Sequence, residues 1–163
     1  MLEKFKIEFK WASIFTAISI IWMYVEKYLG LHDEHIEYHS IVGLVIIVPL
    51  ALSIYLCLKE KKRDYYNGEM TWQKAFLSGA LLSLVIAGLS IGTTYVMTQY
   101  VSPDFFSVAI EKSVAKGTNR EMMEQFFNLN SYISQGIMFY LAFGVMISAL
   151  MALIIRSKAK AKF

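Results

Sequence analysis

The three histidines of this sequence lie within eight residues of one another, in a polar segment between two apolar stretches. They are His32, His35 and His39, and the acidic residues Asp33, Glu34 and Glu37 stand among them. Imidazole nitrogens and carboxylate oxygens are ligands of zinc and similar divalent ions. If a helix begins near Asp33, then His35 and His39 lie one turn apart on a shared face, with His32 just before it. The segment therefore predicts a divalent-metal site made by the three histidines.

Two other interpretations fit the histidine segment. Asp33 can cap the following helix while the histidines sit at the wet membrane interface and bond to water and lipid headgroups. Histidine also titrates near neutral pH, so the segment can act as a pH sensor. The sequence lacks the HExxH arrangement of a metalloprotease, and neither a second histidine cluster nor a cysteine pair completes a metal site.

Glu26 is a second candidate, because it lies near the end of an apolar stretch that begins at Trp11. At about 1.5 Å per residue it lies roughly 22 Å along a span, short of the far boundary of a hydrocarbon core about 30 Å thick. An ionisable group there indicates a proton carrier, a cation site or a partner for a histidine. The alternative is an interfacial carboxylate beside Lys27. Other polar side chains expected near the same level are Gln99, Asn128, Asn130 and Gln135.

No catalytic constellation accompanies these residues. The sequence has no GxSxG elbow, no glycine-rich phosphate loop and no recognisable pair of nucleophile and base. The single cysteine, Cys57, excludes an intrachain disulfide. We therefore expect a protein that is not an enzyme and that needs no cofactor other than the divalent metal ion considered above.

Membrane-spanning helices must position these candidates. Of the 163 residues, 56% are hydrophobic and only 18% are charged, and the mean hydropathy is +0.47. Soluble globular domains carry about 25% charged residues. Charge-free runs cover residues 38–58, 75–103 and 125–155, and a helix needs about 20 apolar residues to cross a bilayer. We read the apolar stretch near the N-terminus as an uncleaved first span. We therefore predict an all-α, integral membrane four-helix bundle that forms a single domain over residues 1–163. Its spans are expected at about 9–29, 40–58, 76–100 and 133–155.

The lysines and arginines predict how these spans are oriented. Twelve of the 16 lie in the N-terminal tail, in the loop after the second span and in the C-terminal tail. The positive-inside rule therefore places both termini in the cytoplasm and the 30–39 and 101–132 loops outside. The net charge of +3 is explained by this orientation and by contact with anionic lipid. No basic face with base-stacking aromatic residues predicts nucleic-acid binding.

The second extracytoplasmic loop, residues 101–132, carries its own helix signals. The tripeptide Ser102-Pro103-Asp104 predicts a helix start, and Gly117 predicts a stop. Thr118 and Glu121 then form the pattern of a capping box. We predict a short helical hairpin that covers the mouth of the bundle or lies on the membrane surface, as a lid or as a face for a partner.

Small residues recur at four-residue spacing on the third and fourth spans. They are Gly79, Ser83, Ala87, Gly88 and Gly92, then Gly136, Gly144, Ser148 and Ala152. Such stripes allow helix backbones to approach closely in lipid. They predict that the third span packs against the fourth, or that two chains form a homodimer. Pro49 predicts a kink in the second span.

Four segments of the chain carry a family resemblance. They are Glu26–Ile36 (EKYLGLHDEHI), Tyr65–Thr71 (YYNGEMT), Ser102–Phe106 (SPDFF) and Phe126–Tyr132 (FFNLNSY). Together they resemble the small bacterial membrane proteins catalogued as domain of unknown function 4199. The resemblance runs from the first span to the last. It implies a four-helix protein of the bacterial inner membrane and no established activity.

Two functions fit these features. The first, which we favour, is a non-enzymatic accessory or envelope-homeostasis protein in the lipid bilayer, with another membrane protein or a second copy as its partner. The alternative is a small proton- or metal-ion-coupled transporter or channel that uses Glu26 and the outer histidine cluster. Four helices enclose little volume, so transport would require a dimer. In either case we expect the protein in a bacterial inner membrane with both termini cytoplasmic.

Overall fold

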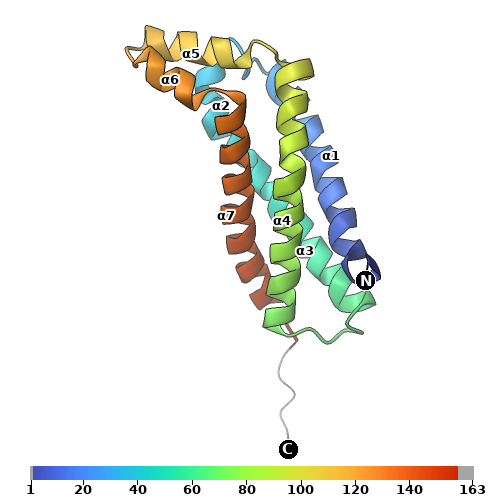
Figure 1. Cartoon of the computed structure of the whole chain (residues 1–163). Coiled ribbons are helices and arrows are strands. Elements are labelled where there is room, and N and C mark those ends of the chain that lie inside the picture. Colours follow the sequence, from blue (N-terminus) through green and yellow to red (C-terminus); the bar gives the residue numbers. More distant parts are fainter. Residues whose placement is uncertain (1, 158–163) are drawn as a thin grey trace, which may run out of the picture.

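The computed structural model describes residues 2–157, and these residues form helices and turns without any strand. Four long helices lie side by side (Figure 1). They are α1 (Lys6–Tyr28), α3 (Ile47–Asp64), α4 (Trp72–Val96) and α7 (Leu129–Ile155). The shorter elements are η1 (Leu2–Phe5), α2 (Ile36–Val42), the 3-10 turn η2 (Gly43–Ile46), the π-helical turn η3 (Met97–Val101), α5 (Phe105–Ala115) and α6 (Arg120–Phe126). The prediction of an all-α membrane protein is confirmed.

Three continuous helical segments are long and apolar enough to cross a membrane: Ile36–Asp64, Trp72–Val101 and Leu129–Ile155. They correspond to the spans predicted at 40–58, 76–100 and 133–155. The span predicted at 9–29 corresponds to α1, which packs alongside α3 and α4 but is not among these three. Charged residues near both ends of α1, including Glu8 and Glu26, lower its apolarity. The fourth span therefore stays a prediction.

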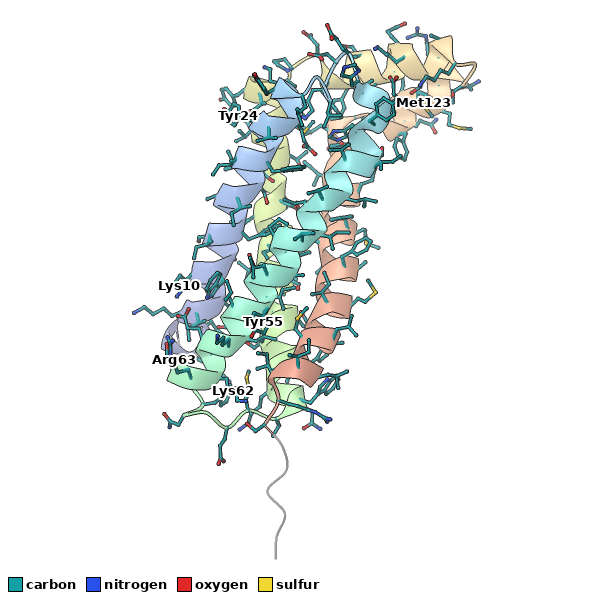
Figure 2. The ribbon with its side chains drawn as sticks, turned by 180° about the vertical axis from the view of Figure 1, so that it is seen from behind. Lys10, Tyr24, Tyr55, Lys62, Arg63 and Met123 are labelled. Carbon is teal, nitrogen blue, oxygen red and sulfur yellow. The ribbon has the colours of Figure 1, made fainter. Side chains whose placement is uncertain are left out.

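The described chain begins and ends at the same end of the bundle (Figure 1). We call this the inner end, after the predicted orientation, and it also holds the α3–α4 connector. The opposite, outer end holds the α1–α2 loop and the α5–α6 hairpin. Figure 2 shows Lys62 and Arg63 near the inner end and Met123 on the hairpin at the outer end. The histidine segment and the hairpin therefore lie at the same end of the molecule.

Two reciprocal contacts bring α4 and α7 together. A Cβ atom at Gly79 would lie 2.7 Å from the Cβ of Ser148, and one at Gly144 would lie 2.6 Å from the Cβ of Ser83. These parts of the small-residue stripes therefore pack within the chain, as one of the two alternatives predicted. The GxxxG pair differs, because no described atom lies within 4 Å of a Cβ at Gly88 or Gly92.

The α5–α6 hairpin extends sideways beyond the bundle at the outer end (Figures 1 and 2). Gly117 makes the turn between its helices with a φ of +93°, which suits glycine. The second helix begins later than the predicted Thr118 cap: Asn119 is the N-cap, and its side chain accepts a hydrogen bond from the Met122 amide at 3.1 Å. This start agrees with the preference for asparagine over threonine at the N-cap.

The second span is interrupted before Pro49 and not after it. The chain changes from α2 to the 3-10 turn η2 at Gly43–Ile46, and Pro49 then occupies the first turn of α3. A proline at the start of a helix costs little, because the first amides have no partner within the helix. The irregular turn brings Gly43 opposite Glu26, where a Cβ would lie 3.5 Å from Glu26 Oε1.

A buried ion pair at the inner end was not predicted. Lys61 Nζ lies 2.7 Å from Glu8 Oε1, and the two side chains are 3% and 2% exposed. The Ser78 hydroxyl donates to Glu8 at 2.6 Å. The pair joins α1, α3 and α4 at one point.

Candidate functional site

Three ionisable side chains from three segments meet inside the outer end of the bundle. Glu26 comes from the last turn of α1, His32 from the loop that follows and His39 from α2. One potential ligand atom from each lies within 4.8 Å of the others. Glu26 and His32 are only 7% and 3% exposed, and His39 is half-buried. We call these three residues the outer cluster.

A tight turn after α1 explains why His32 faces inward. Gly30 has a φ of +72°, a conformation that other residues rarely adopt. Its carbonyl accepts hydrogen bonds from the amides of Asp33 at 3.2 Å and His35 at 2.7 Å. The Leu31 amide bonds back to the Glu26 carbonyl at 2.9 Å. The chain therefore folds back over the end of α1 and buries His32 beside Glu26.

The same turn excludes His35 from the cluster. The helix begins at Ile36 and not near Asp33, so His35 is an exposed residue before the helix. The spacing that was expected to place His35 and His39 on one helical face therefore does not apply. Asp33 does not cap α2 either, because its carboxylate accepts from the adjacent Glu34 amide.

Each member of the outer cluster has one hydrogen-bonded neighbour. The Trp22 indole donates to Glu26 Oε1 at 2.8 Å. His32 Nδ1 lies 2.7 Å from the Ser102 hydroxyl, and His39 Nε2 lies 2.9 Å from the Tyr132 hydroxyl. These contacts link the cluster to Ser102, the residue that follows η3, and to α7.

The second nitrogen of each imidazole has no such neighbour. His32 Nε2 and His39 Nδ1 are buried, and neither finds a hydrogen-bond partner among the described residues. His32 Nε2 lies 3.8 Å from Glu26 Oε2. Buried polar atoms in native structures are almost always satisfied. The described residues therefore leave two buried imidazole nitrogens without a protein partner close to a buried carboxylate.

Aromatic rings cover the cluster on the outer side. The Phe105 ring packs edge-on against His32 and His39, with centroid distances of 5.4 and 5.0 Å. It also lies 5.5 Å from the Tyr132 ring. The Lys27 ammonium donates to the Val101 carbonyl and ties the end of α1 to η3. The first residue of α5 therefore shields the imidazoles from solvent.

A cavity of about 150 Å³ lies beside the cluster, toward the membrane interior. Glu26, His39 and Tyr132 line its outer part. The hydroxyl groups around it belong to Ser19, Ser90, Thr93, Thr94 and Tyr140. Towards the inner end the bundle is packed by side chains that are at most 1% exposed, namely Phe15, Leu50, Ile54, Leu82 and Ile86.

The other polar residues predicted near this level do not join the cluster. Gln99 is exposed on η3. Gln135 donates to the Phe126 carbonyl at 3.3 Å and lines a groove that His39 and Tyr132 also line, without a hydrogen bond to either among the described residues. Asn128 caps α7 by accepting from the Ser131 amide at 3.0 Å, and Asn130 is exposed.

Ser102, Tyr132 and Trp22 are the site residues that the sequence did not assign to it. Ser102 was expected to cap a helix, and Trp22 and Tyr132 are of the residue types that anchor helices at membrane interfaces. Ser102 and Tyr132 lie 70 and 93 residues along the chain from the histidines that they contact. Both fall within the segments that carry the family resemblance, which was the one pointer to them.

Two imidazoles and one carboxylate form a donor set for a divalent transition metal, and they suit zinc better than magnesium or calcium. Zn–N distances of about 2.0–2.1 Å place the ligand atoms of a tetrahedral ion roughly 3.3 Å apart. The atoms of the outer cluster span up to 4.8 Å. Side-chain rotations that bring the most distant of these atoms about 1.5 Å closer would form a three-ligand site.

Comparisons with known proteins give one match. The family described as protein of unknown function (DUF4199) matches residues 10–157 of the chain. No curated protein and no solved structure matches it.

Proposed function

The chain belongs to the DUF4199 family, whose function is unknown, and we propose that it is a non-enzymatic membrane protein that binds a divalent transition-metal ion of the zinc class. The site is the outer cluster of Glu26, His32 and His39. One observation carries the proposal: two buried imidazole nitrogens that have no hydrogen-bond partner within residues 2–157 lie close to a buried carboxylate. The ligand set predicted from the sequence changes in one member, since Glu26 takes the place of His35.

The proposal includes a fourth membrane span and an orientation. The length of α1 and its packing against α3 and α4 support a span there. An even number of spans agrees with the position of both ends of the described chain at the inner end (Figure 1). The lysines and arginines favour a cytoplasmic inner end. The metal site would then face the outside of a bacterial inner membrane, in keeping with a role in envelope homeostasis.

Binding is favoured over transport through a single chain. A transported ion would have to pass from the outer cluster through the inner half of the bundle. That half is filled by side chains such as Phe15, Leu50 and Leu82, which are at most 1% exposed. Phe15 also packs edge-on against Tyr140, with ring centroids 5.6 Å apart, at the inner side of the cavity. A metal-ion-coupled transporter or channel therefore remains the second candidate, because the convergence of Glu26 with the histidines is what it requires.

Metal analysis of the purified full chain tests the proposal. The protein in mild detergent would be loaded with zinc, freed of excess metal and measured by elemental mass spectrometry. We expect near-stoichiometric zinc in the wild type and its loss in Glu26→Gln and His39→Ala. His35→Ala is the matched control, because His35 is exposed and outside the cluster, and it should retain zinc. A wild type without zinc after loading, or loss of zinc in His35→Ala alone, would contradict the proposal.

A further inference from the structure

The two histidines of the outer cluster are held by hydroxyl groups from opposite ends of one segment. Ser102 stands directly before the α5–α6 hairpin, and Tyr132 stands in the first turn of α7, directly after it. Ser102 contacts His32 Nδ1 at 2.7 Å and Tyr132 contacts His39 Nε2 at 2.9 Å. Phe105, the first residue of α5, packs against both imidazoles and against Tyr132. The metal site and the two ends of the hairpin therefore share the same contacts.

These hydroxyl contacts select the atoms that can bind a metal. A neutral imidazole carries a proton on one nitrogen and a lone pair on the other. Where a hydroxyl oxygen accepts the N–H of one nitrogen, the lone pair stays on the other, which becomes the ligand. In the tautomers in which Ser102 and Tyr132 accept from His32 Nδ1 and His39 Nε2, the lone pairs lie on His32 Nε2 and His39 Nδ1. These are the two buried nitrogens that find no hydrogen-bond partner in the described part of the chain.

We propose that Ser102 and Tyr132 are positioning residues of the metal site, and that metal binding thereby fixes both ends of the α5–α6 hairpin. This inference rests on the proposed function. The metal draws the two imidazoles toward Glu26, and each imidazole draws its hydroxyl partner with it. Ser102 and Tyr132 are the points at which the chain enters and leaves the hairpin segment. The occupied site therefore restrains the hairpin that projects beyond the bundle (Figure 2).

The link acts in both directions. If the metal stabilises the positions of Ser102 and Tyr132, then removal of either hydroxyl weakens metal binding by the same coupling free energy. Replacing the residue that orients a ligating histidine typically lowers metal affinity by about 10- to 100-fold. The hairpin gives no ligand itself, so its response to the metal depends on these two hydroxyls and on Phe105.

Zinc affinity of the full chain in detergent, measured by competition with a chromophoric chelator, is the first test. We expect Tyr132→Phe and Ser102→Ala to bind about 10- to 100-fold more weakly than the wild type. Tyr140→Phe is the matched control, because Tyr140 lies on the same helix and lines the same cavity without a hydrogen bond to either histidine. Ser102→Thr keeps a hydroxyl and should restore the affinity lost in Ser102→Ala.

Hydrogen–deuterium exchange is the second test. It reports on the two ends of the hairpin separately, whereas a general loss of stability would change exchange throughout the chain. Zinc should slow exchange in the wild type at residues 102–108 and at the start of α7. In Tyr132→Phe saturated with zinc, the slowing at the start of α7 should be lost, while that at residues 102–108 should persist through the Ser102–His32 contact. Circular dichroism of each variant confirms that it is folded before these comparisons are made.

The two proposals fail in different ways. A wild type that binds no zinc removes the proposed function and this inference with it. If the wild type binds zinc, and Tyr132→Phe and Ser102→Ala bind zinc as tightly as the wild type does, only this inference is overturned. It is also overturned if zinc leaves hairpin exchange unchanged in the wild type.

Discussion

Glu8 and Lys61 form an ion pair at the inner end from which water is excluded. Both side chains are at most 3% exposed, and the carboxylate also accepts from the Ser78 hydroxyl. A buried charge that loses its partner keeps its desolvation cost and gains nothing in return. The pair therefore matters most when only one member is changed.

Lys61→Met should lower the free energy of unfolding by about 3–5 kcal/mol, because it leaves the Glu8 carboxylate buried and unpaired. The double variant Glu8→Leu/Lys61→Met should recover most of this loss, since no buried charge then remains. Denaturant titration in lipid–detergent micelles, followed by circular dichroism, measures both. The exposed Arg63→Ala variant is the control and should be close to the wild type, because surface ion pairs contribute little. A double variant no more stable than Lys61→Met would contradict this account.

The sequence treated Glu26 and the three histidines as two candidate sites, and the structure brings Glu26 together with His32 and His39. Histidines in a polar segment beside an intramembrane glutamate are visible as candidates, and a link between Glu26 and a histidine was among the alternatives. The choice between His35 and Glu26 depends on where α2 begins. The turn at Gly30 sets that start, through a φ of +72° and two hydrogen bonds to its carbonyl. A backbone conformation of this kind is not specified by the spacing of the histidines.

Among the elements, α4 and α7 depend most on small residues. Gly79 faces Ser148 and Gly144 faces Ser83, so that each glycine receives the serine of the opposite helix. Both serine hydroxyls bond to carbonyls of their own helix, Ser83 to Gly79 at 2.9 Å and Ser148 to Gly144 at 2.6 Å. Neither serine side chain can therefore rotate away from the interface without breaking its hydrogen bond.

Gly144→Ala should separate α4 and α7 and lower the free energy of unfolding by about 1–3 kcal/mol, the usual effect of an added methyl group in a full interface. The added Cβ would lie 2.6 Å from the Cβ of Ser83, which is too close for two carbon atoms. Gly88→Ala is the matched control on α4, because no described atom lies within 4 Å of a Cβ there. The same denaturant titration measures both variants. Equal stabilities for the two would show that the helices do not approach as described.

The helices themselves follow closely from the sequence, because long apolar runs and capping residues are local features. Three of the predicted spans agree with the apolar helical segments, and most of their ends differ by only a few residues. The hairpin was expected from Gly117 and the residues around it. The sequence did not predict which small residues of the stripe on α4 contact α7 and which do not. Gly79 packs inside and Gly88 faces outward on the same helix, and only the position of a neighbouring helix distinguishes them. The start of α6 at Asn119 has a different, local origin, because two neighbouring residues can each serve as the cap.

On the scale of the whole molecule, the two ends of the bundle differ in charge and in contacts. The inner end carries lysines and arginines such as Lys62 and Arg63 (Figure 2) and is joined by the Glu8–Lys61 pair. The outer end carries the outer cluster and the hairpin. The region between them is apolar and closely packed. The proposed function places the outer cluster outside the membrane, so the orientation of the bundle can be measured as a test of it.

Single-cysteine labelling measures that orientation. Cys57 is fully buried, so the wild type should not react with a membrane-impermeant maleimide and serves as the background. In intact spheroplasts, Lys116→Cys at the exposed tip of the hairpin should be labelled, and Asn67→Cys in the α3–α4 connector should not. Permeabilisation should expose Asn67→Cys. The reason is that positive charges near the inner end resist translocation across the membrane.

A third position separates four spans from three. Lys6 is exposed at the start of α1. If α1 and the Ile36–Asp64 segment both cross the membrane, an even number of spans separates Lys6 from Asn67. Lys6→Cys should then be labelled only after permeabilisation, as Asn67→Cys is. If α1 lay on one surface, the two positions would react from opposite sides, and Glu26 would no longer be held at the outer level by a helix that begins inside. Labelling of Lys6→Cys in intact spheroplasts would therefore contradict both the fourth span and the extracytoplasmic metal site built on it.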